Sequence, residues 1–143
     1  MNILLFCAVI GAFVFTVDCY DEKYDNVDIY EVLNNKRLLK NYMGCVLSEP
    51  GISCNQQGTM LKKNLPDAIQ TDCKNCTDRQ KIGAFKAIEY LMRENSSYWD
   101  KIQQRFDPQN HFRMRNIRQI NYCTTHRNNF NDAEFLSLFN HRY

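Results

Sequence analysis

The sequence contains few of the residues that break regular structure, since its 143 residues include only 5 glycines and 3 prolines. This scarcity disfavours a many-turned β-sandwich, which needs glycine- or proline-rich turns between its short strands. No segment alternates apolar and polar residues over the length of a strand. Helical periodicity is present instead, and the sequence predicts an all-α protein of about six short helices.

The motifs of several common enzyme active sites are also missing. The chain has no glycine-rich phosphate loop, no G-x-S-x-G nucleophile elbow and no H-E-x-x-H zinc motif. Its three histidines form no recognisable zinc-ligand set, and a net charge of +2 is too small to argue for nucleic acid. We therefore expect a protein that is not an enzyme, takes no cofactor or metal, and has no nucleic-acid partner.

Long apolar runs are limited to the N-terminus, where residues 3–17 are almost entirely apolar and a charged stretch begins at Asp18. About 15 residues are too few to span a bilayer, for which about 20 are needed. The pattern is typical of a secretory signal peptide. We expect residues 1–19 to be this peptide and the mature protein to be secreted, without stable membrane insertion. An uncleaved membrane anchor is the alternative.

Several segments carry apolar residues at helical spacing. The clearest begins with the capping box Thr77 to Gln80 and continues to about Arg93. Pro66 suits the first turn of a helix because its nitrogen needs no partner there, so it is expected to start a helix of its own. The helices expected in chain order span about residues 27–33, 38–47, 57–64, 66–71, 77–93 and 98–106, with a further short one at 109–115.

Four of the five cysteines outside the signal peptide form two pairs that are close in sequence, Cys45-x8-Cys54 and Cys73-x2-Cys76. A zinc site is one interpretation, but the first gap is unusual for zinc and export disfavours it. A redox-active Cys73–Cys76 motif should follow a strand, and none is expected. We favour two local disulfides, each of which brackets a turn between helices.

Cys123 is the fifth of these cysteines and has no partner in this scheme. Its polar neighbours, such as Asn121 and His126, predict exposure, and Arg118 and Arg127 would favour its thiolate form. An odd cysteine in a secreted protein is either a free thiol or an intermolecular link. We predict a disulfide-linked homodimer through Cys123.

Five stretches of the chain share a specific pattern that includes the four-cysteine array. They are YDNVD at 24–28, NKRLL at 35–39, LPDAIQTDC at 65–73, the Cys73–Cys76 pair followed by Gln80 and Gly83, and Trp99 before FDP at 106–108. Together they resemble the insect chemosensory proteins, also called the OS-D or pheromone-binding A10 family, over residues 20–114. The resemblance implies a secreted six-helix fold with both disulfides and an internal apolar channel for long-chain hydrophobic molecules.

The resemblance also implies that three aromatic residues line or close this channel, and periodicity adds three apolar residues of the 77–93 helix. The ligand-binding residues that we expect are Tyr24, Tyr42, Trp99, Ile82, Phe85 and Ile88. Tyrosine and tryptophan offer an apolar body with one polar group that can meet a ligand oxygen. Ordinary core packing is the competing interpretation for all of them, and above all for the three residues added from periodicity.

Residues 115–143 form an extension beyond the family-like region. Asn131 or Asp132 could cap a short helix there that carries several apolar residues. Three fates are open for this segment: it folds back on the channel mouth, contacts a partner, or stays disordered. The Asn95-Ser96-Ser97 sequon lies in an interhelix loop and predicts N-glycosylation at Asn95.

The function that follows is a secreted carrier of small hydrophobic molecules, such as semiochemicals, fatty acids or related lipids. The alternative is an extracellular signalling or interaction protein in development or defence, which the extension and Cys123 would favour.

Overall fold

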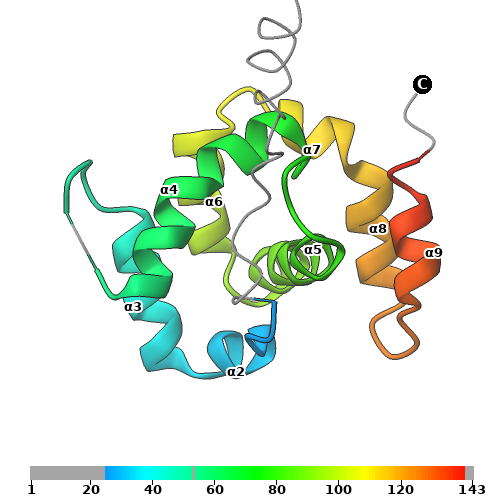
Figure 1. Cartoon of the computed structure of the whole chain (residues 1–143), viewed down its shortest axis with the longest axis horizontal. Helices are drawn as coiled ribbons and strands as arrows, with labels where there is room; N and C mark the ends of the chain where they lie inside the picture. Colours follow the sequence, from blue (N-terminus) through cyan, green and yellow to red (C-terminus); the bar gives the residue numbers. More distant parts are fainter. Residues whose placement is uncertain (1–24, 53, 141–143) are drawn as a thin grey trace, which may run out of the picture.

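The computed structural model describes residues 25–52 and 54–140, and within them the chain forms helices and no strand (Figure 1). The helices are α2 (Ile29–Asn34), α3 (Lys36–Val46), α4 (Gln56–Thr71), α5 (Asp78–Glu94), α6 (Ser96–Phe106), α7 (His111–Arg115), α8 (Ile117–Thr125) and α9 (Asp132–Ser137). The predicted all-α class is therefore confirmed. The expected signal peptide, residues 1–19, and Tyr24 lie outside the described residues.

Short polar side chains begin the helices at several of the predicted positions. The Thr77 hydroxyl accepts a hydrogen bond from the Gln80 N–H at 3.1 Å, and the Gln80 side chain accepts from the Thr77 N–H at 3.1 Å, which completes the capping box of α5. Asn35 caps α3 and Asn131 caps α9, each through a side-chain oxygen that accepts backbone N–H hydrogen bonds without the return bond of a capping box. The first helix differs, because Asp28 caps it and α2 begins at Ile29 instead of Val27.

Helix α4 corrects the prediction of two separate helices at 57–64 and 66–71, since it runs unbroken from Gln56 to Thr71 with Pro66 inside it. Proline deletes one backbone hydrogen bond and crowds the preceding turn, which disfavours but does not forbid a continuous helix. Contacts with α3 and the burial of Ile69 hold both halves in line. Tertiary packing here outweighs the local signal that proline gives.

Helix α5 is the central helix of the domain. It contacts α2, α6, α8 and α9. In Figure 1 it lies in the middle and is seen nearly end-on, with α3 and α4 on one side and the α8–α9 pair on the other. The hydrophobic core therefore surrounds α5, and the apolar stripe that predicted this helix is buried against several elements.

The C-terminal extension packs on α5 of the helical domain, while its place at a channel mouth stays a prediction, as the channel does. The buried ring of Phe85 on α5 lies 5.6 Å from Phe135 and 5.5 Å from Phe139 between centroids, and 5.8 Å from Phe112. Phe135 has no exposed surface. Tyr122 of α8 donates a hydrogen bond from its hydroxyl to the Glu134 carboxylate of α9 at 3.0 Å, and this bond joins the two helices of the extension.

Helix α8 was not predicted from the sequence. Two of its inward-facing residues, Gln119 and Tyr122, carry polar groups. Its buried side therefore lacks the continuous apolar stripe from which a helix is predicted. The Gln119 amide donates to the Leu138 carbonyl at 3.3 Å, so this polar residue is used to hold the end of α9.

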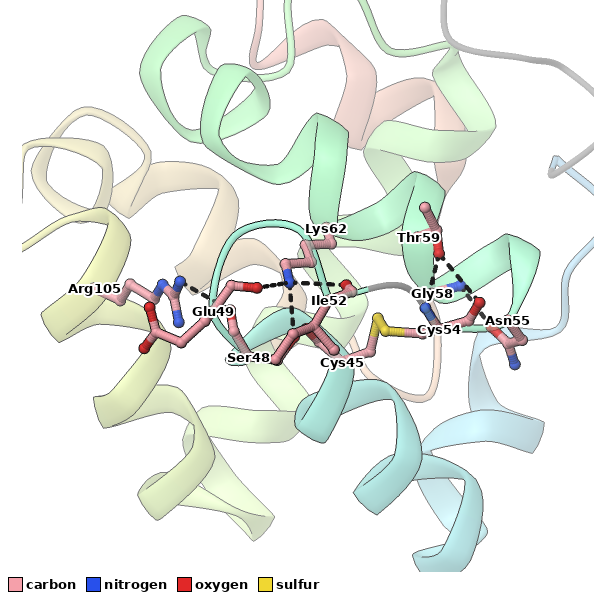
Figure 2. The surroundings of a disulfide bond; sticks show 10 residues. All are labelled: Cys45, Ser48, Glu49, Ile52, Cys54, Asn55, Gly58, Thr59, Lys62 and Arg105. Carbon is pink, nitrogen blue, oxygen red and sulfur yellow. Dashed lines mark hydrogen bonds between the residues drawn. A yellow bond between two sulfur atoms is a disulfide. The ribbon is translucent and has the colours of Figure 1, made fainter.

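Both favoured disulfides, Cys45–Cys54 and Cys73–Cys76, are present, and they join helix ends. The first links the end of α3 to the start of α4 (Figure 2). Gly58 lies beside it, and a Cβ atom there would lie 3.1 Å from the Cys45 sulfur and 3.0 Å from the Asn55 side-chain oxygen, so a larger residue would shift one of these neighbours by a few tenths of an ångström.

The loop beside this disulfide is held by two cations that bind its backbone (Figure 2). The Lys62 ammonium donates to the Ser48 hydroxyl at 2.7 Å and to the carbonyls of Glu49 at 2.5 Å and Ile52 at 3.2 Å. The Arg105 guanidinium donates to the Leu47 and Ser48 carbonyls at the C-terminus of α3. Cations at this end of a helix satisfy its last carbonyls and complement its dipole.

Replacing Lys62 with Met should destabilise the folded protein by about 1–2 kcal/mol, because three acceptors lose a charged donor. Lys63→Met is the matched control, since Lys63 is exposed one residue away, and its effect should stay within about 0.5 kcal/mol. Urea unfolding at pH 7 with both disulfides oxidised measures both variants. Equal midpoints for the two variants would show that the Lys62 contacts add nothing.

Replacing Phe135 with Ala should lower the free energy of unfolding by about 3–5 kcal/mol, since it leaves a large cavity among packed rings. Ile117→Ala in the same extension is the control, because Ile117 is exposed, and it should cost less than about 1 kcal/mol. If Phe135→Ala left stability unchanged, the extension would not be part of the cooperative core.

Candidate functional site

The structure brings five of the six predicted ligand-binding residues into one hydrophobic cluster. Trp99 and Phe85 are buried members of this cluster. Tyr42 of α3 and the α5 residues Ile82 and Ile88 are partly buried and pack against it. These five residues come from α3, α5 and α6, while the cluster as a whole includes residues of every helix from α2 to α9.

Phe85 differs from the other residues of the cluster in its neighbours. Its ring contacts Phe112, Phe135 and Phe139, which belong to α7 and to the extension. These contacts are those of a core residue, which is the competing interpretation given above for this position. A role for Phe85 and for Ile82 and Ile88 toward a ligand stays a prediction.

Trp99 carries the one chemical feature that sets this cluster apart from a plain apolar core. Its side chain is 7% exposed, yet its indole N–H has no hydrogen-bond partner among the residues that the structure describes. A buried donor without an acceptor costs about 1–3 kcal/mol. Proteins rarely leave such a group unpaired, so the indole N–H is a donor that an incoming oxygen atom could satisfy.

Tyr42 lies in the same cluster, and burial raises the pKa of its phenol above the usual range. The hydroxyl therefore remains protonated at neutral pH. The site residues offer apolar walls and neutral polar groups, with no charge among them. Such a site suits a long apolar molecule that has one neutral polar end.

Two surface hollows lie at the edge of this cluster, since Leu47 lines one and Ile69 and Phe106 line the other. One, of about 300 Å³, is lined by Leu47, Lys101, Gln104 and Arg105. The other, of about 350 Å³, lies between the ends of α4 and α6 and the start of α7, and its lining includes Ile69, Phe106 and Arg115. Neither is lined by Trp99 or Tyr42, and the internal channel that the resemblance implies stays a prediction.

Sequence reasoning missed a buried ionic cluster around Glu89, which lies one helical turn after Phe85 on α5. Glu89 is buried, and its Oε1 atom lies 3.0 Å from Nε of Arg93 and 3.2 Å from Nε of Arg127. Arg127 follows α8, so this pair fastens the extension to α5. Only the Glu89–Arg93 spacing of four residues was visible in the sequence, and such a pair usually lies in solvent.

Cys123 faces this cluster, and the prediction that it is exposed is wrong. It is 3% exposed and has no disulfide partner. Burial, and then the negative charge of Glu89, raises the pKa of its thiol to about 12. Its neighbours Asn121 and Thr124 face solvent, but Cys123 lies on the inner side of α8. Residues that are adjacent in sequence point in different directions from a helix, so polar neighbours do not imply an exposed cysteine.

The burial of Cys123 removes the support for the predicted disulfide-linked homodimer. An intermolecular disulfide needs an accessible, reactive thiolate, and Cys123 has neither property. Both disulfides of the structure lie within one chain.

Two features of other kinds of site are absent from the part of the chain that the structure describes. No group of three His, Cys, Asp or Glu side chains there could hold a metal ion. Of the helices within residues 25–52 and 54–140, none has the length and apolar character needed to cross a bilayer.

The pattern of the insect pheromone-binding family, A10/OS-D, matches residues 20–114. The chain belongs to this family. The A10/OS-D match ends within α7, so α8 and α9 lie beyond it.

Two relatives and one solved structure illustrate this kinship. The putative odorant-binding protein A10 of Drosophila melanogaster is 43% identical over 96 residues, which are 67% of this chain and 61% of that protein. Allergen Tha p 1 of Thaumetopoea pityocampa is 38% identical over 98 residues, 68% of this chain and 76% of the allergen. A solved chemosensory protein in complex with bromo-dodecanol is 39% identical, with a TM-score of 0.61, over 66% of this chain and 93% of that one.

The buried thiol predicts slow chemical labelling of the native protein. In the chain that begins at residue 20, four cysteines form disulfides and Cys123 is left to react with maleimide at pH 8. It should react at least 100-fold faster in denaturant than in buffer, because in the native protein its thiolate is scarce and access to it is closed. Rapid labelling of the native chain, or a reductant-sensitive dimer on a gel, would contradict this.

The same thiol makes stability depend on pH. Its pKa is near 9.0 when unfolded and about 12 when folded. The stability contributed by the protonated thiol is therefore complete below pH 9 and is lost progressively as pH rises toward 12. Between pH 8.5 and 10, wild type should lose about 1 kcal/mol more than Cys123→Ala in urea unfolding.

Proposed function

We propose that this member of the A10/OS-D family carries small hydrophobic molecules that have an apolar chain and one hydrogen-bond acceptor. It acts by binding, without chemical change of the ligand, and it does so as a secreted protein. The observation that carries this proposal is the buried indole N–H of Trp99, which has no partner within an apolar cluster.

The energetics support a long-chain ligand. Burial contributes about 0.8 kcal/mol for each CH2 group, so a dozen carbons gain on the order of 10 kcal/mol before the cost of ordering the chain. The polar end adds a smaller term, about 0.5–1.5 kcal/mol for a neutral hydrogen bond. The affinity therefore depends mainly on chain length, while the donor at Trp99 selects ligands that carry an oxygen.

Two methionines give the cluster side chains that can change conformation around different ligands. Met43 is buried in the cluster and Met92 packs against it. Methionine is flexible and repacks around irregular shapes, which suits a carrier of several related ligands. Similarity to the bromo-dodecanol complex supports the same ligand class, since that molecule combines a long chain with one hydroxyl.

The extension and Cys123 were the two features that favoured the signalling alternative, and neither now supports it. Cys123 is buried, and the extension packs on α5.

The proposal is tested with a fluorescent apolar probe, N-phenyl-1-naphthylamine, displaced by 1-decanol or by 1-chlorodecane. Trp99→Phe keeps an aromatic ring and removes the N–H. This variant should bind 1-decanol about 5–10-fold more weakly, from the loss of one neutral hydrogen bond, while its affinity for 1-chlorodecane changes little.

Tyr98→Phe is the matched control, since it removes a polar group from the adjacent position of α6 and should leave both affinities unchanged. Trp99 is also the only tryptophan of the chain, so ligand binding should change its fluorescence without interference. Equal losses for both ligands in Trp99→Phe would exclude the hydrogen bond, and the absence of saturable binding would exclude the carrier function.

A further inference from the structure

The corner between α7 and α8 presents an unusual set of side chains to solvent. Phe112 and Asn116 are one helical turn apart and both point inward, where the Asn116 amide donates to the Asp72 carboxylate at 2.6 Å and to the Phe112 carbonyl at 2.8 Å. Met114 lies between them in sequence, so helical geometry turns it away from the core. It is 71% exposed, and Ile117 just beyond is 43% exposed.

Arginines surround these two apolar side chains. From residue 105 to residue 127 the chain has five arginines, no lysine, and a single acidic residue, Asp107. Asp107 is buried and accepts hydrogen bonds from the backbone N–H groups of Phe112 and Arg113, so it does not offset this charge at the surface. The segment is therefore strongly basic although the whole chain is nearly neutral.

Three of the five arginines are engaged within the fold. Arg105 binds the end of α3, Arg115 pairs with Asp72 at 3.0 Å, and Arg127 pairs with Glu89. Arg113 and Arg118 are exposed, and neither forms an ion pair with any residue that the structure describes. These two are the cations that remain available to an external anion.

We propose that this corner, formed by Arg113, Met114, Ile117 and Arg118, docks the protein on the surface of anionic lipid membranes. Arg113 and Arg118 bind lipid headgroup phosphates or carboxylates, and Met114 and Ile117 enter the boundary between headgroups and acyl chains. The proposal rests on the carrier function, because a carrier of apolar molecules loads and unloads where those molecules are dissolved.

The arrangement of the corner favours a membrane over an acidic protein. Its apolar side chains are separate and flanked by arginines, with no groove between them and no aromatic anchor. Protein interfaces usually have a contiguous core that is rich in aromatic residues and depleted of charge. A headgroup layer, in contrast, admits single apolar side chains between its charges and needs no complementary shape.

The experiment is flotation of the mature chain, residues 20–143, with phosphatidylcholine vesicles that contain none or 30% phosphatidylserine. Binding should require phosphatidylserine and should weaken as NaCl rises from 0.1 to 0.5 M. Each arginine near an anionic surface contributes about fivefold, so Arg113→Gln/Arg118→Gln should bind about 25-fold more weakly. Met114→Gln/Ile117→Gln should also reduce binding.

The matched control is Arg37→Gln/Lys40→Gln, which removes the same charge from exposed positions of α3, on the opposite side of the molecule from α7 and α8 (Figure 1). It should bind like wild type. Equal weakening in the control would reduce the effect to net charge and overturn the proposal, as would equal binding to neutral vesicles. Failure to bind vesicles, with retention of the chain on an acidic protein through the same corner, would assign the surface to a protein partner.

Displacement of N-phenyl-1-naphthylamine by 1-decanol, measured on the same variants, separates this proposal from the carrier function. Corner variants should keep wild-type affinity for 1-decanol while they lose vesicle binding. Loss of both properties in the corner variants, with intact circular dichroism, would show that the corner belongs to the ligand site instead.

Discussion

The burial of α5 by the helices around it is the constraint on which the rest of the structure depends. Helices α2, α6, α8 and α9 pack on α5, and the Phe85 ring of α5 also contacts aromatic rings of α7 and the extension. Isolated helices of six to eleven residues are marginal in water. Most helices of this domain are that short, so they persist because α5 and the core around it give them a surface to pack against.

Polar contacts fix the helices relative to one another, because apolar packing has no direction and would allow neighbouring helices to slide. Asp72 ties the end of α4 to Arg115 and Asn116, and Glu89 ties α5 to Arg127 after α8. Lys62 and Arg105 hold the loop beside the first disulfide. These contacts join parts of the chain that lie far apart in sequence, and they allow a small domain to enclose an apolar interior.

The extension packs on α5, whereas the two polar groups of the proposed ligand site belong to α6 and α3. The extension covers the side of α5 that carries Phe85, Glu89 and the contacts to Cys123, while Trp99 of α6 and Tyr42 of α3 belong to the part that matches the A10/OS-D family. A member of this family can therefore gain two helices without altering the residues that the carrier proposal depends on.

The sequence by itself determined the helical class, the capping box at Thr77 and both disulfide pairs, because these depend on residues close together in the chain. Only the tertiary structure decided that α4 continues through Pro66, that Cys123 is buried beside Glu89, and that the indole N–H of Trp99 has no partner. Each of these depends on which distant side chains come together, and local periodicity contains no information about those contacts.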